Sequence, residues 1–243
     1  MSEQILQNIA KVQGAFQEGA KIAAQVDMQE FSSRFENENT PYLSAKFEGA
    51  SYQFALSNIE NLESDWLWFV NNNPKHQIQI FVGLGWALAE TNNLDSCSEC
   101  DFISEEAKQK VADGFGFYEG TFRKRKVVSL VQNNIFPQKF FQDYYAGVGR
   151  SIWYSNLGNP NEAFQFIEKF PEQVKPYLWR GIGTAFCYVG GFSVSELEQI
   201  VSTSNSYKQQ FSEGVAACYI SRKKSKLLTD EVLLAAAYFS IKD

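Results

Sequence analysis

The sequence predicts an all-α protein built from helical hairpins, and three observations support this prediction. Glycines recur at a nearly constant spacing along almost the whole chain. Several segments begin with residues that start helices. Apolar side chains also recur with the periodicity of an amphipathic helix, as in Phe164, Ile167 and Phe170.

The repeated glycines divide the chain into seven units. Their spacings are 30, 34, 31, 33, 34 and 33 residues, and a period near 33 is typical of two-helix repeats. The residue two positions later is small in six units, and the residue one position earlier is acidic in four. The motif glycines are Gly19, Gly49, Gly83, Gly114, Gly147, Gly181 and Gly214.

Helix starts are predicted at three places along the chain. Each combines a capping side chain with an acidic residue or a proline in the first turn. They are Ser104 before Glu105 and Glu106, Asn159 before Pro160, and the capping box from Ser193 to Glu196. Pro171 and Pro176 then separate a helix near 160–169 from one near 177–189. Each unit is therefore expected to hold a shorter helix followed by a longer one with the motif glycine.

Paired glycines inside the longer helices need an explanation, because each costs about 1 kcal/mol relative to alanine. None of the pairs completes a G-x-G-x-x-G motif or clearly follows a predicted strand, so a dinucleotide-binding fold is excluded. We expect the glycines to let neighbouring helix backbones approach closely. The prediction is one domain over residues 1–243, an α-solenoid or a compact toroid-like superhelix.

Composition limits the classes of function. The formal net charge of −6 makes the chain a poor nucleic-acid binder. We see no signal peptide and no apolar run of the roughly 18 residues that a membrane span needs, so we expect a soluble, cytoplasmic protein. Aromatic residues make up 15% of the chain, which indicates either an aromatic core or an apolar groove.

Cysteine and histidine offer little catalytic chemistry. Cys97 and Cys100 form a lone C-x-x-C, expected to be ordinary loop cysteines rather than a disulfide or metal site. Cys187 and Cys218 are expected to be buried. His76, the only histidine, is expected at the surface. We predict no cofactor and no metal.

At the glycine motifs the sequence resembles the UnbL-like family, whose members are encoded in enediyne polyketide gene cassettes. The matching runs occur in the family's order and cover roughly residues 40–235. The resemblance implies an accessory protein of polyketide biosynthesis with polyketide synthase components as partners, and it assigns no catalytic residue. The family's Phe-His after the third run is Phe117-Tyr118 here, which puts a histidine role in doubt. The runs are 47–50, 82–89, 113–117, 147–154, 178–185, 188–191 and 213–217.

Charged side chains within the apolar motif helices are candidate binding residues. Arg150 lies three positions after Gly147, where other units have an aromatic residue. If buried it needs a partner, and we favour an inter-repeat ion pair with Asp113 or Asp143 over a ligand-binding role. Further candidates for binding a ligand or partner are Asp113, Glu119, Trp86, Trp153 and Trp179.

The run from Arg123 to Lys126 is the only strong basic cluster. It is expected to be a solvated helix end, or else a docking patch, through Arg123 and Arg125, for an acidic partner or a phosphate.

Three functions remain open at this point. The first is a non-catalytic repeat protein that binds partner proteins, which we rank highest. The second is a binder or chaperone of a hydrophobic, polyene-like small molecule, which a large apolar cavity ending in one or two polar groups would favour. The third is an enzyme that acts on such a molecule, which a pocket carboxylate with a raised pKa would favour. A homo-oligomer is possible in each case.

Overall fold

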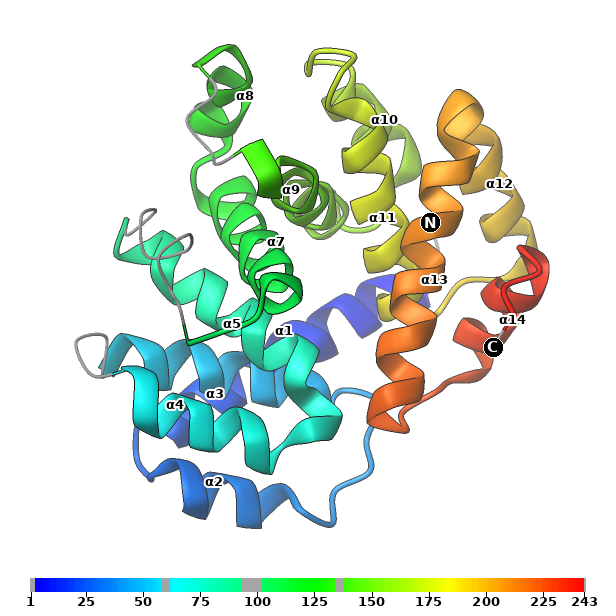
Figure 1. Ribbon diagram of the computed structural model, residues 1–243. Helices are drawn as coiled ribbons and strands as arrows, with labels where there is room; N and C mark the ends of the chain where they lie inside the picture. Colours follow the sequence, from blue (N-terminus) through cyan, green and yellow to red (C-terminus); the bar gives the residue numbers. More distant parts are fainter. Residues whose placement is uncertain (1–2, 58–61, 93–101, 134–137, 243) are drawn as a thin grey trace.

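The computed structural model describes residues 3–57, 62–92, 102–133 and 138–242. Within these ranges the chain is all-helical, as predicted, and contains no strand (Figure 1). The long helices each contain a motif glycine. They are α1 (Glu3–Ala23), α3 (Leu43–Ser57), α5 (Gln77–Glu90), α7 (Glu105–Phe122), α9 (Phe141–Ser155), α11 (Lys175–Val189) and α13 (Lys208–Ser225).

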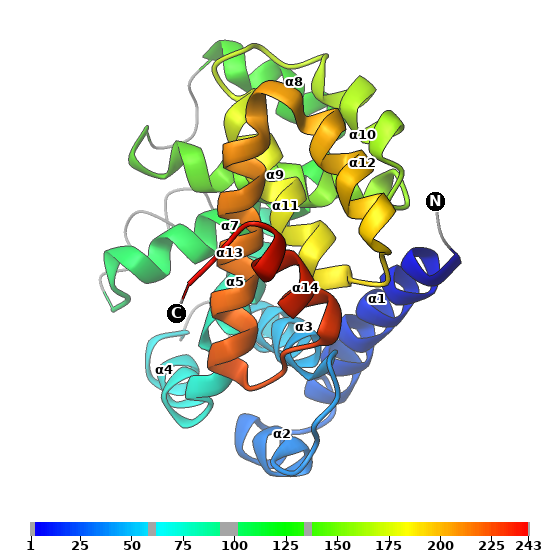
Figure 2. The same cartoon turned by 90° about the vertical axis from the view of Figure 1, so that its right-hand side faces the viewer.

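Shorter helices follow long ones along the chain and lie toward the outside of the molecule (Figures 1 and 2). Four of them pack in pairs, α2 with α4 and α10 with α12. Three single-turn 3-10 helices, at 74–76, 138–140 and 205–207, precede long helices directly. The shorter helices are α2 (Met28–Phe35), α4 (Leu62–Asn72), α8 (Lys124–Asn133), α10 (Pro160–Ile167), α12 (Val194–Ser204) and α14 (Asp230–Tyr238).

All three predicted helix starts are confirmed. The side chain of Ser104 accepts a hydrogen bond from the amide of Ala107 at the start of α7. Asn159 caps α10. Ser193 forms both halves of the capping box with Glu196 at the start of α12. These local interactions satisfy amides that have no partner within the helix.

The motif glycines lie where consecutive long helices touch. A Cβ atom on Gly49 would overlap the carbonyl oxygen of Phe16, and one on Gly19 would overlap that of Lys46. Between α5 and α7 the same reciprocal contact is made by Gly114 against Val82 and by Gly85 against Val111. Each long helix therefore packs chiefly against the next long helix, with backbones close enough for Cα–H···O contacts. This confirms the packing role predicted for the glycines.

The row of long helices curls until distant members meet. Gln79 at the start of α5 donates a hydrogen bond of 2.8 Å to Ser221 in α13. Asn8 in α1 donates one of 3.0 Å to the carbonyl oxygen of Val189 at the end of α11. Arg222 in α13 reaches the carbonyl oxygen of Pro41 before α3, at 2.8 Å. One face of each long helix is thereby turned toward a common centre.

None of the helices in the described part of the chain combines the length and hydropathy that a membrane-spanning segment requires.

Candidate functional site

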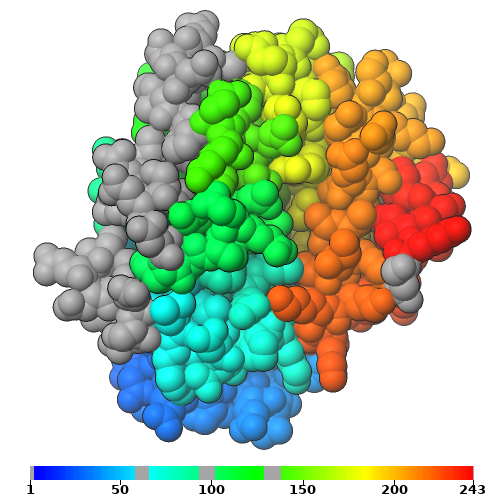
Figure 3. Space-filling model, in the orientation of Figure 1, coloured from blue at the N-terminus to red at the C-terminus, as the bar shows by residue number. Residues whose placement is uncertain are grey.

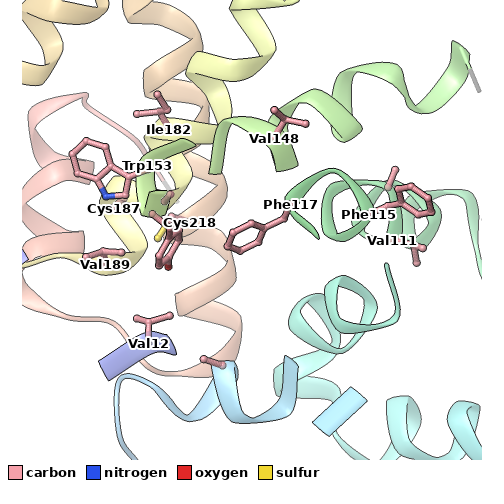
Figure 4. Packing of buried hydrophobic residues seen from close by; sticks show 14 of the residues in the cluster. Val12, Val111, Phe115, Phe117, Val148, Trp153, Ile182, Cys187, Val189 and Cys218 are labelled. Carbon is pink, nitrogen blue, oxygen red and sulfur yellow. The ribbon is translucent and has the colours of Figure 1, made fainter. Parts of the chain in front are cut away.

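Side chains at three positions of the glycine motif line the centre of the molecule. Positions −1, +3 and +7 from a motif glycine are four residues apart, so they share one helix face. In α7 these positions hold Asp113, Phe117 and Thr121. Figure 4 shows Phe117 on the opposite side of α7 from Phe115 and Val111, toward Cys218 and Val12. The central face therefore follows from the position of the glycine in each helix.

Two cavities, each of about 400 Å³, lie along this face. In the aromatic cavity, six of the fourteen lining residues are aromatic. Its exposed residues are Gln13, Gln17 and Phe122. Its residues are Val12, Gln13, Phe16, Gln17, Ala45, Glu48, Trp86, Phe117, Thr121, Phe122, Arg150, Tyr154, Ser155 and Tyr188.

The polar cavity is the second of the two and lies among α5, α7, α9, α11 and α13. The segments that line it come together on the face shown in Figure 3. Its charged residues include Asp113, Asp143, Arg180 and Glu213. Arg150, Tyr154 and Tyr188 line both cavities, so these three side chains form the wall between them.

Arg150 is held in this wall by acids from two other helices. Its Nη1 donates a short hydrogen bond to Asp113 Oδ1, and its Nη2 lies 4.0 Å from Glu48 Oε1. The guanidinium also lies 4.6 Å from the ring centre of Phe117, within the range of a cation–π contact. The predicted pair of Arg150 with Asp113 is confirmed, while Asp143 pairs instead with Arg180, at 2.9 Å.

The carboxyl group of Glu48 has a raised pKa. The residue is 6% exposed. Burial together with the negative charge of Asp113 raises its pKa to about 7, although Arg150 and Trp86 act in the opposite direction. Burial alone would lower the pKa of Arg150, but Asp113 and Glu48 outweigh it and raise the pKa further. Arg150 therefore stays charged, while Glu48 can exchange a proton near neutral pH.

Two buried polar groups at the aromatic cavity lack a hydrogen-bond partner. The hydroxyl of Tyr188 and the indole N–H of Trp86 are both shielded from solvent without an acceptor at hydrogen-bond geometry. The Trp86 N–H lies close enough to Glu48 to lower the pKa of that carboxyl, but it does not complete the bond. Unpaired buried donors are rare and call for an explanation.

Several predicted candidates lie away from both cavities. Glu119, 1% exposed, accepts hydrogen bonds from Tyr144 at 2.7 Å, Lys126 at 2.6 Å and Arg123 at 3.2 Å. The basic cluster thus partly neutralises a buried acid, and Arg125 is left exposed beside it. Trp153 and Trp179 are fully buried, and neither contributes to either cavity wall.

Three residues that line the cavities were absent from the predicted candidates. They are Glu48, Tyr154 and Tyr188, at positions −1 or +7 of the motif. The +7 position could have identified the two tyrosines from the sequence. Tyr154 lies one helical turn after Arg150, and Tyr188 lies one helical turn after Thr184, so each shares a helix face with the +3 residue.

The expectation for His76 is wrong. It is 7% exposed, its Nδ1 shares a hydrogen bond with the hydroxyl of Ser44 at 3.0 Å, and its ring stacks on Phe47 at 4.2 Å. Burial, with a smaller contribution from Lys75, lowers its pKa to about 4. His76 is therefore neutral at pH 7 and packs where α3 meets the start of α5.

The cysteine predictions divide into two groups. Cys187 and Cys218 are buried, as predicted, and Cys218 borders the polar cavity. Cys97 and Cys100 lie outside the described residues.

Comparison with known proteins places this geometry in a family. Searches of curated proteins and of solved structures found no match. A family model described as "Protein of unknown function (DUF1702)" matches residues 1–242, almost the whole length of the chain. The chain therefore belongs to the DUF1702 family of proteins of unknown function.

Proposed function

We propose that this protein binds an elongated, mostly apolar small molecule in the aromatic cavity. The observation that supports this most strongly is a cavity of about 400 Å³ with aromatic walls that ends on Arg150, Glu48 and Tyr188. Small-molecule sites typically enclose 300–1,000 Å³ and combine apolar walls with a few fixed polar groups. This combination is the feature that distinguishes a small-molecule binder from a purely scaffolding protein.

The cavity is difficult to explain as a packing fault. Protein interiors contain few voids larger than a water molecule. Here the surrounding rings are held in a defined arrangement, since Trp86 packs at 4.9 Å from Phe16 and 5.0 Å from Phe117. The seam glycines fix the distance between the helices that carry these rings. The space is therefore part of the helix arrangement.

We further propose that the helical arrangement is a repeat architecture of the α-solenoid or toroid type. The ordered packing of each long helix on the next and the recurring seam glycines support this view. The resemblance to the UnbL-like family supports a setting in enediyne or polyene polyketide biosynthesis. A polyene is apolar, as the aromatic lining of the cavity favours. Pathway proteins would then be partners in delivering or receiving the ligand.

The binding proposal can be tested with diphenylhexatriene, an uncharged polyene that fluoresces in apolar surroundings. We expect saturable fluorescence enhancement with the wild-type protein. Ser155→Trp, which places an indole at the cavity wall, should reduce it strongly. Ser202→Trp is the matched control, because Ser202 is exposed on α12 and lines neither cavity. Absent enhancement, or equal loss in both variants, would contradict binding in the aromatic cavity. Native mass spectrometry of protein from its own host would give the mass of the natural ligand.

A second candidate function is acid–base catalysis on the bound molecule, and the raised pKa of Glu48 favours it. A carboxyl with a pKa near the working pH is suited to proton transfer. Glu48→Gln should then retain the ligand but prevent its conversion. Recovering the same product from wild type and Glu48→Gln would exclude this role for Glu48.

A further inference from the structure

We infer that the end of the ligand that reaches the wall between the cavities bears an uncharged oxygen acceptor, such as a ketone, ester, ether or alcohol, rather than a carboxylate or phosphate. This inference rests on the proposed binding function and specifies its ligand class. It follows from which polar groups near the wall between the cavities already have hydrogen-bond partners and which do not.

The groups without partners are donors. The Tyr188 hydroxyl and the Trp86 N–H have no acceptor at hydrogen-bond geometry, and both side chains line the aromatic cavity. An indole N–H can only donate. A site whose buried donors are unpaired gains from a ligand acceptor and discriminates against ligands that lack one. The carbonyl or hydroxyl oxygen of a neutral ligand meets this requirement without bringing a charge.

The charged groups near the wall between the cavities disfavour an anionic ligand. The only cation on the wall of the aromatic cavity, among the described residues, is Arg150, which already bonds Asp113 and lies 4.0 Å from Glu48. With both acids ionised, these three side chains carry a net charge of about −1. A ligand carboxylate would face this negative charge in a site shielded from water, where repulsion is strong.

A second buried arginine lies close by, but its donors are directed elsewhere. Arg222 lies 4.3 Å from the ring centre of Tyr188, but it belongs to neither cavity wall. Its Nη atoms donate to the carbonyl oxygens of Pro41, Leu227 and Tyr188 itself. The Nη atoms are therefore engaged by backbone acceptors and are not directed at a ligand in the aromatic cavity.

Two probes of equal chain length test the head group: decan-2-one and decanoate. Their affinities are measured by calorimetry at pH 8.5, where Glu48 is ionised. We expect decan-2-one to bind at least about tenfold more tightly than decanoate, the range that one or two charge or hydrogen-bond mismatches produce. Equal or tighter binding of decanoate would overturn the inference.

Tyr188→Phe provides the residue-level test. It should weaken the binding of decan-2-one by about three- to tenfold. It should not lower the midpoint of thermal unfolding, because the hydroxyl that it removes has no hydrogen-bond partner in the protein. Tyr207→Phe makes the same chemical change at an exposed bond to Glu172 and should leave the affinity unchanged. An unchanged affinity in Tyr188→Phe would contradict the inference.

The diphenylhexatriene assay separates the two proposals. If this hydrocarbon binds but decan-2-one has no advantage over decanoate, the ligand class is wrong while the binding function stands. If neither the hydrocarbon nor either probe binds, the binding function itself is wrong, and the inference falls with it.

Discussion

Two buried glutamates in this protein have opposite surroundings. Glu119 accepts three hydrogen bonds from Tyr144, Lys126 and Arg123 and faces neither cavity. Glu48 is comparably buried, yet its ion pair with Arg150 spans 4.0 Å and it borders the aromatic cavity. The difference shows that burial of a charge does not by itself reveal a site. The distinguishing property is whether the protein supplies enough partners of its own.

The largest expected effect is that of Glu119→Ala. Removing the acceptor of three hydrogen bonds from a buried cluster should lower the free energy of unfolding by about 3–5 kcal/mol. Urea denaturation measures the loss. Ligand binding should be unchanged under conditions where the variant is folded. A loss below about 1 kcal/mol would mean that Glu119 is not the structural centre that its hydrogen bonds indicate.

Arg150→Ala should have the next largest effect. It leaves Asp113 and Glu48 close together in a partly buried site without their cation, which should cost about 2–4 kcal/mol at pH 8. Lowering the pH should restore part of this loss, because protonation removes the repulsion between the two acids. Urea titrations at pH 5.5 and pH 8 test this. Unchanged stability at both values would leave Arg150 with a binding role alone.

The third prediction concerns the pH dependence of Glu48. Its folded-state pKa of about 7 exceeds the unfolded value of about 4.3, so the folded state binds the extra proton between these pH values. Stability from this group is therefore greatest below about pH 4 and is lost as pH rises to the folded-state pKa near 7, by up to about 4 kcal/mol. Glu48→Gln should remove this dependence and be more stable than wild type at pH 8. A parallel pH profile in the two proteins would contradict the raised pKa.

The smallest effect comes from paired Tyr→Phe substitutions, which compare the two sites directly. Tyr144→Phe removes a 2.7 Å hydrogen bond to Glu119 and should cost about 1.5–3 kcal/mol. Tyr188→Phe removes a hydroxyl without a partner and should change stability by less than about 0.5 kcal/mol. Thermal unfolding of the two variants measures the difference. Equal losses would mean that Tyr188 already has a partner in the protein.

The sequence predicted the features that depend on neighbours in the chain. Helix starts at Ser104 and Asn159 follow from local capping chemistry. The seam glycines follow from recurrence and from the cost of glycine in helices. The pairing of Arg150 with Asp113 was predictable because it joins adjacent long helices at fixed register.

The features that were missed depend on how the row of helices curls. The approach of Arg150 to Glu48 joins α9 to α3, and Tyr188 of α11 borders a cavity shared with α1 and α5. The curvature that brings these helices together is set by many small packing angles, which no local pattern reports. His76 was misassigned for a related reason, because its stacking partner Phe47 comes from another helix.

The seam glycines have a consequence for how the family can vary. Because backbone touches backbone at each seam, the distance between long helices is already at its minimum and does not depend on side-chain size. The diameter of the central space is thus set by the main chain, whereas its chemistry is set by the residues at −1, +3 and +7. Under the proposed binding function, substitutions at those positions would change which molecule is bound while the spacing of the long helices stays the same.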